Sequence, residues 1–370
     1  MRGQSKSQPE FLTLRSPESV VPPEHPLREI KRRVDQVLKE MSPLFNRMYA
    51  DEGRPSIPPE RLLKAKLLIA LYSVRSETLF CEQLGYNLLF RWFLDMDLME
   101  PTFVQSAFSK NQERLLEHQV AQKFFHAVYE LGRQENWASD EHFTVDGSLI
   151  EAAASLKSFA PKGGTKNRSD DDPGNPTVNF HGQKRSNATH RSTTDPEARL
   201  YRKGHGREAK LYFTAHALME NRHGLLSDIQ ITSATGTAET ETALQQLRQH
   251  SRRTGVAAAS VGADKGYHNA QFVSRCRKGR IRPHVAEMKD RKVAGLDRRT
   301  TGRQAYAISQ RKRKRVEEIF GWMKTVGGFR RSRFIGVERT GLWAYFVGAA
   351  YNLVRCVRLA LGPPVRAAAR

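Results

Sequence analysis

Apolar residues recur at three- and four-residue intervals over the first third of the chain. Ile30, Val34 and Leu38 follow this spacing, and Pro58-Pro59-Glu60 precedes a second, strongly apolar run. The interval matches the turn of a helix that buries one face, and proline is well tolerated in a first helical turn. The pattern predicts helices near residues 27–38, 58–71, 79–98 and 106–135.

These helices form an N-terminal domain, which we expect at residues 27–137. One interpretation is a bundle that only supports the rest of the protein. The other is a helix-turn-helix-like module that binds DNA, and the pattern by itself leaves both open. Residues 1–26 are polar and carry several prolines, so a flexible arm is expected there.

At His142 the spacing of apolar residues changes from a helical to an alternating pattern. Phe143 and Val145 frame a short strand expected to end at Asp146, and a run of small residues and valine predicts another strand ending at Asp264. Further strands are predicted at residues 210–218, 225–231 and 281–285. Further helices are predicted at residues 237–253, 269–278, 309–324 and 341–358.

The predicted order after His142 is strand, strand, strand, helix, strand, helix, strand, helix. It fits a ribonuclease-H-like α/β fold, a mixed sheet with flanking helices, for a domain at residues 138–360. Residues 157–207 interrupt this order because they are rich in glycine, polar and basic residues and almost devoid of apolar ones. A long, mobile, basic loop is therefore predicted.

The charge of the chain indicates a polyanionic partner. Lys and Arg number 61 against 39 Asp and Glu, a formal net charge of +22. Nucleic acid suits this excess, because each phosphate contact releases counterions. A membrane is less suitable, since the longest apolar stretch, 342–354, is too short to span a bilayer and no signal-peptide segment opens the sequence. A soluble, intracellular protein is expected.

Cysteine usage agrees with a reducing compartment and with the absence of a structural zinc site. The three cysteines, Cys81, Cys276 and Cys356, are widely separated and form no Cys-x-x-Cys pair.

Two acids stand at predicted strand ends, Asp146 and Asp264. In open α/β sheets, ligand sites form outside such strand ends. Each acid taken alone has a plain alternative, because an Asp-Gly pair after a strand is also a common turn signal. The two positions are therefore candidates for a shared site.

A third acid can come from the predicted helix 309–324, which offers Glu317 and Glu318. At about 100° per residue, Glu317 lies on the flank of the apolar stripe and shares a face with Arg313 and Lys324. Glu318 points almost directly away from the core. Glu317 is the better candidate, although the basic run around Arg313 could also be an ordinary solvated helix face.

These motifs together resemble the DDE transposases of bacterial insertion sequences. In one group of that family the third acid lies in a Tyr-x-x-Arg-x-x-x-Glu-x-x-x-x-x-x-Lys signature, and Arg313, Glu317 and Lys324 fit it in register, with Gln310 in the place of the tyrosine. The similarity extends from about residue 30 to 350. It includes the segments 86–93, 145–148, 195–199, 263–267 and 320–324.

The resemblance implies a transposase with Asp146, Asp264 and Glu317 as catalytic, metal-binding residues. Two Mg²⁺ ions, replaceable by Mn²⁺, suit such hard oxygen ligands. The implied partners are double-stranded DNA, both the terminal inverted repeats of the element and the target, and a second copy of the chain in a homodimer. The implied location is the bacterial cytoplasm, at the nucleoid. DNA contacts are expected from Arg313, Lys324, Lys265 and Trp322, although packing is the favoured role of Trp322.

Two alternatives remain at this point. One is a nuclease of the same fold, which would cut DNA without joining it. The other is an inactive, transposase-derived DNA-binding regulator, against which the presence of all three acids argues.

Overall fold

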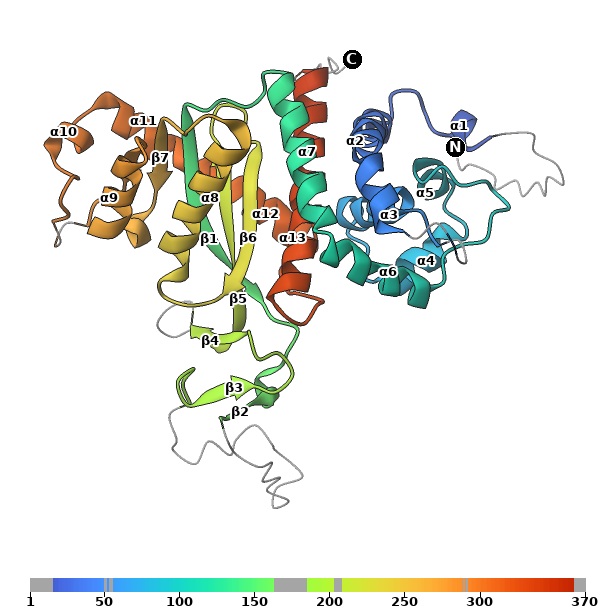
Figure 1. Ribbon diagram of the computed structural model, residues 1–370, viewed down its shortest axis with the longest axis horizontal. Helices are drawn as coiled ribbons and strands as arrows, with labels where there is room; N and C mark the ends of the chain where they lie inside the picture. The colour runs from blue at the N-terminus through green and yellow to red at the C-terminus, as the bar shows by residue number, and fades with distance from the viewer. Residues whose placement is uncertain are drawn as a thin grey trace, which may run out of the picture.

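The computed structural model describes residues 16–49, 52, 56–162, 185–202, 208–288, 290 and 292–362. A helical part and a part built on a sheet lie on either side of two long helices, α7 and α13 (Figure 1). The helices of the N-terminal half are α1 (Pro17–Val20), α2 (Pro26–Met48), α3 (Pro59–Leu71), α4 (Glu77–Leu84), α5 (Leu88–Phe93), α6 (Gln105–Glu117) and α7 (Val120–Gln134).

The helical N-terminal half is confirmed, with two differences in detail. The stretch 79–98 forms two short helices, α4 and α5, because the Asn87 side chain accepts a hydrogen bond from the Phe90 amide and so begins a new helix. Residues 1–15 of the predicted arm lie outside the described residues. Residues 17–20 form the short helix α1, and Glu18 in it is bonded to Arg28 and Trp92.

The second half holds the strands β1 (His142–Glu151), β2 (Phe159–Pro161), β3 (His190–Ser192), β4 (Arg199–Arg202), β5 (Ala209–Glu220), β6 (Leu226–Ser233), β7 (Ser260–Ala263) and β8 (Arg282–Val285). Its helices are α8 (Ala238–Thr254), α9 (Ala270–Lys278), α10 (Arg298–Thr301), α11 (Gln304–Lys312), α12 (Val316–Thr325) and α13 (Val337–Leu361). Short 3₁₀ turns are η1 (Leu156–Ser158), η2 (Lys265–Tyr267) and η3 (Arg313–Arg315).

The main sheet is mixed, and its order is β6-β5-β1-β7-β8, with β4 paired to the start of β5. β5 is antiparallel to β1 and β6, whereas β1, β7 and β8 are parallel. Phe143 and Val145 of β1 belong to the core under α8 and α9, and Ile150 belongs to the core under α12 and α13. Helices thus cover both faces, which confirms the ribonuclease-H-like fold class.

Three predictions about this half need correction. The strand predicted to end at Asp146 continues to Glu151, because β5 pairs with β1 over its whole length and overrides the turn tendency of Asp146-Gly147. The predicted loop 157–207 contains β2, β3 and β4, and its residues 163–184 and 203–207 lie outside the described residues. The predicted helix 309–324 is divided by the 3₁₀ turn η3.

Helix α13 joins the two halves. It packs on α2, α3 and α7 as well as on α12 and β6, and it is buried on most sides. Close approach depends on Gly348, where a Cβ would stand 3.0 Å from Phe125 of α7 and 3.1 Å from Leu226 of β6. The predicted apolar helix 341–358 is therefore confirmed. No helix within the described ranges is long and apolar enough to cross a membrane.

The start of α13 is held by the segment before β4. Asp195 is fully buried and accepts a hydrogen bond from the Gly336 amide at 3.2 Å, and Glu197 accepts one from the Val337 amide at 2.9 Å. Acids at a helix N-terminus offset its unpaired amides and its dipole. This part of the predicted loop is thus a fixed support for α13.

The packing at Gly348 gives a stability prediction. Gly348→Leu should lower the free energy of unfolding by about 1–3 kcal/mol, because the added side chain overpacks the contact with α7 and β6. Urea denaturation measures the change. Gly341→Ala is the control on the same helix, since a Cβ there meets nothing within 4 Å, and it should stabilise by about 0.4–1 kcal/mol. Equal effects of the two substitutions would contradict this account of α13.

Candidate active site

Asp146 and Asp264 lie side by side because β1 and β7 are parallel neighbours. Thr144 pairs with Gly262, and each aspartate follows two residues later on its own strand. Adjacent strands are about 4.8 Å apart. The pairing of β1 with β7 ends at Thr144, so this edge of β1 is open where the two carboxylates stand.

Both aspartates are held by the backbone that follows them. Asp146 Oδ1 accepts a hydrogen bond from the Gly147 amide at 2.8 Å, and Asp264 Oδ1 accepts one from the Gly266 amide at 2.8 Å. Burial raises the pKa of Asp146 to about 7 in spite of its hydrogen bond to Gly147, and the charges of Asp264 and Glu239 raise it further. Arg313 acts in the opposite direction.

Glu239 is an acid of this site that the sequence analysis missed. It lies in the first turn of α8, and a Cβ on Gly147 would stand 2.7 Å from its Oε1. Burial raises the pKa of Glu239, and so does the charge of Asp264. An acid in a first helical turn is a common stabiliser of helices, so the sequence carries no signal that separates Glu239 from such an ordinary residue.

The segment around Glu317 packs against β1. At one end Arg313 interacts with the charge of Asp146, and at the other Lys324 Nζ donates a hydrogen bond to Ser148 Oγ at 2.6 Å. Glu317 is exposed and lies between these two contacts on the chain. The two basic residues of the signature thus reach the strand that carries the first aspartate.

Gln310, which stands where the signature has tyrosine, holds Arg313. Its Nε2 donates to the His284 carbonyl of β8 at 2.6 Å, and its Oε1 accepts from Arg313 Nε at 2.9 Å. Although Gln310 replaces the tyrosine of the signature, its side chain links Arg313 to the sheet.

The other residues named in the sequence analysis are exposed or take part in packing. Glu318 is 52% exposed, pairs with Arg315 and borders a shallow pocket with Tyr351 of α13. Trp322 contacts Tyr351 edge to face, with ring centroids 5.8 Å apart. Lys265 is exposed in η2, directly after Asp264.

The chemistry of these acids suits a hard divalent ion, but the side chains are not closed around one. Within the described ranges, no three His, Cys, Asp or Glu side chains are arranged to hold a single metal ion. Mg²⁺ keeps several water ligands and is bound by one or two carboxylates. Half-buried carboxylates that repel one another are the donor set that such an ion would stabilise.

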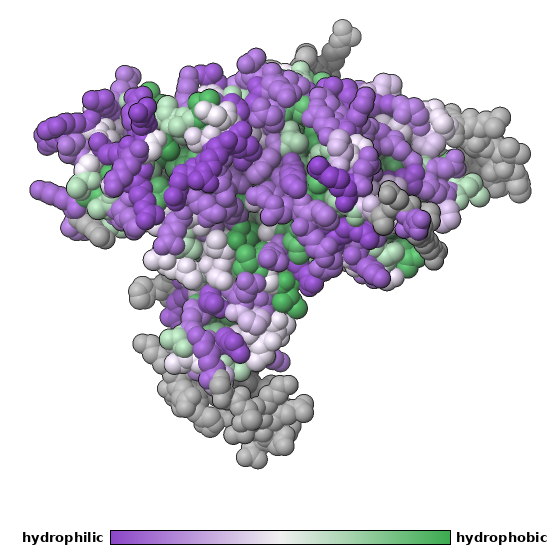
Figure 2. All heavy atoms as spheres, viewed as in Figure 1, coloured by the Kyte–Doolittle hydropathy of each residue, from purple (hydrophilic) through white to green (hydrophobic). Residues whose placement is uncertain are grey.

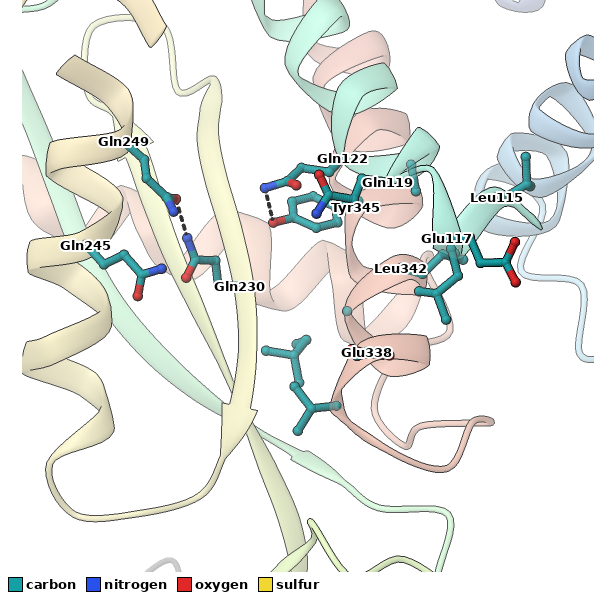
Figure 3. Close-up of a pocket in the computed structure, with 15 residues that line it drawn as sticks. Leu115, Glu117, Gln119, Gln122, Gln230, Gln245, Gln249, Glu338, Leu342 and Tyr345 are labelled. Atoms are coloured by element: carbon teal, nitrogen blue, oxygen red, sulfur yellow. Dashed lines mark hydrogen bonds between the residues drawn. The ribbon is translucent and has the colours of Figure 1, made fainter. Parts of the chain in front are cut away.

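A cavity of the described structure lies away from these acids, at the β6 edge of the sheet. It measures about 530 Å³ and lies between β6, α8, α13 and the α6–α7 corner (Figure 3). Gln230 donates to Gln249 across one side, and Gln122 donates to the Tyr345 hydroxyl on the other. None of the site carboxylates lines it.

A mixed sheet of this order, with helices on both faces, is the ribonuclease-H-like fold, and it places two aspartates side by side at an open strand edge. The family comparison is specific. Residues 137–353 match the model of the transposase DDE domain, and residues 15–114 match that of a transposase domain of the DUF772 type. The chain belongs to the DDE transposases, a family of metal-dependent enzymes that cut DNA. The two matches together indicate the insertion-sequence type.

Solved structures show only distant likeness. A piggyBac transposase synaptic complex with hairpin DNA aligns over 92% of this chain and 77% of that one, at 9% identity and a TM-score of 0.40. A Mos1 transposase paired-end complex aligns over 87% of each chain, at 12% identity and a TM-score of 0.21. No curated protein matches the sequence. The assignment therefore rests on the family models.

The raised pKa of Asp146 gives a pH prediction for the metal-free protein. The folded state binds this proton more tightly than the unfolded chain, whose pKa is near 3.8. The resulting stability is fully present below pH 3.8 and is lost as the pH rises through about 7. From pH 4 to 8, wild type should lose on the order of 3 kcal/mol relative to Asp146→Asn. Urea denaturation in a chelator at both pH values measures this, and parallel losses in the two proteins would refute it.

Proposed function

We propose that this chain is an insertion-sequence transposase that frees the 3′ ends of its element and joins them to target DNA. Asp146, Asp264 and Glu317 are its catalytic acids. The observation that carries the proposal is the parallel register of β1 and β7, which brings two aspartates together at an open strand edge. Contacts of Arg313 and Lys324 with the same strand support Glu317 as the third acid.

These three acids would hold two Mg²⁺ or Mn²⁺ ions. When bound, the ions supply stabilisation of the attacking and leaving oxygens during in-line displacement at phosphorus. The carboxylates of Asp146 and Asp264 would hold the ions at the open edge of β1. The same site can serve hydrolysis and joining, because both are displacements at phosphorus. Water attacks at the element end in the first, and the freed 3′-hydroxyl attacks target DNA and displaces a 3′-oxygen in the second.

Basic residues around the acids would hold the DNA backbone. Arg313 and Lys324 reach β1, which carries Asp146, and the exposed Lys265 directly follows Asp264. Contacts to phosphate position a duplex without reading its sequence. Hydrophilic residues cover most of the face seen in Figure 2. Trp322 is a weaker candidate for a base contact, since its ring packs on Tyr351.

The remaining assignments belong to the same proposal. We assign element-end binding to the helical domain at 27–137 and catalysis to 138–360. Double-stranded terminal repeats and target DNA are the substrates, and a homodimer would pair the two ends. The cell compartment that fits this function is the bacterial cytoplasm at the nucleoid.

A DNA-joining assay distinguishes a transposase from a nuclease and from an inactive DNA-binding regulator. Purified protein with DNA carrying the element's own terminal repeats should cut in Mg²⁺ or Mn²⁺, lose activity in excess chelator, and link the freed 3′ ends to a target plasmid. Products are resolved on sequencing gels. Cutting without joining would indicate a nuclease of the same fold, and binding without either reaction would indicate a regulator.

The choice between neighbouring glutamates is a separate test. Glu317→Gln should lower the cleavage rate at least about 100-fold, because it removes a charge that the ions need and keeps the side-chain volume. Binding to end DNA, measured by gel shift, should stay close to wild type. Glu318→Gln is the matched control and should cleave nearly normally, since its side chain lies toward α13. The opposite pattern would reject Glu317 as the third acid.

A further inference from the structure

Glu239 approaches the site from the face opposite to Glu317. Side chains of β1 alternate, so Val145 packs under α8 while Ser148 is bonded to Lys324 of α12. Gly147 faces α8, and the Glu239 carboxylate lies over it. A Cβ at Gly147 would stand 2.7 Å from Oε1 and 3.2 Å from Cδ of Glu239. The absence of a side chain at position 147 therefore opens the path by which Glu239 reaches the strand edge.

Glu239 and Asp264 border the same point. A Cβ on Gly266 would stand 3.0 Å from Asp264 Oδ1 and 3.5 Å from Glu239 Oε2. Two half-buried carboxylates in such proximity repel each other and are poorly solvated, which is unfavourable unless a cation or a proton intervenes. An acid with only a helix-stabilising role has no reason to turn toward another acid.

Tyr267 adds an independent observation. Its side chain is 1% exposed. Burial is the main reason why the pKa of Tyr267 is raised, and the charges of Glu239, Asp146 and Asp264 raise it further. The buried ring of Tyr267 thus lies near the same three acids, and such an apolar neighbour makes their charged forms less favourable unless a cation is bound.

We infer that Glu239 is a fourth carboxylate of the active site, which offers a hard oxygen ligand to a divalent ion beside Asp264 from the α8 side of the sheet. The inference rests on the proposed function. Mg²⁺ is commonly bound by one or two carboxylates together with waters. Two ions could therefore use four acids, with Glu239 and Asp264 next to one another.

Metal affinity tests this without DNA. Isothermal titration of the full-length protein with Mn²⁺ alone should show at least about a tenfold weaker affinity in Glu239→Gln than in wild type. Glu241→Gln is the matched control in the same helical turn, because Glu241 is exposed, and it should bind as wild type does. Gly147→Ala should reproduce the loss, since its methyl group displaces the Glu239 carboxylate.

The Mn²⁺ affinity of Asp146→Asn shows whether the proposed metal site exists independently of Glu239. If Asp146→Asn loses Mn²⁺ while Glu239→Gln and Gly147→Ala keep wild-type affinity, the metal site stands and the role of Glu239 is refuted. If wild type itself takes up no Mn²⁺, the proposed site and the inference both fail. A weakening in Glu239→Gln that Gly147→Ala shares, in proteins with unchanged circular dichroism, supports the fourth carboxylate.

Discussion

Repulsion between half-buried carboxylates is the constraint on which the rest of the site depends. The parallel register of β1 and β7 fixes Asp146 beside Asp264, and neither strand can move without breaking the centre of the sheet. Burial already raises the pKa of Asp146 to about 7. The surrounding elements supply what offsets this cost: backbone amides from Gly147 and Gly266, and the positive charge of Arg313.

Helix α13 explains why the sheet and the helical domain form one body. Its small residues let α7 and β6 approach closely, and the acids Asp195 and Glu197 hold its first amides. The core cluster that contains Ile150 of β1 also contains Val34 of α2 and Leu67 of α3. The helical domain and the sheet that carries the acids therefore share one packed core.

The spacing of apolar residues and the order of elements along the sequence were sufficient for the fold class and for the helical half. They also placed Asp146 and Asp264 at strand ends, although Asp146 lies within β1 and not at its end. The short strands β2, β3 and β4 lacked an apolar alternation and depend on pairing partners elsewhere in the chain, as at Phe159 with Ser192. Asp146-Gly147 was read as a strand end because local turn chemistry hid the long partner β5. Glu239 was missed because only the tertiary fold brings α8 over Gly147.

The net charge of the chain overstates the surface available to phosphate. In the helical domain Arg33 is 3% exposed and paired with Glu29 and Glu135, and Lys64 and Lys66 are buried against acids of their own. In the basic run of η3, Arg315 is bonded to the carbonyls of the β5–β6 turn. A cation already desolvated by an acid or a carbonyl releases no counterion on binding DNA. The salt dependence of DNA binding should therefore reflect exposed residues such as Lys265, rather than the composition as a whole.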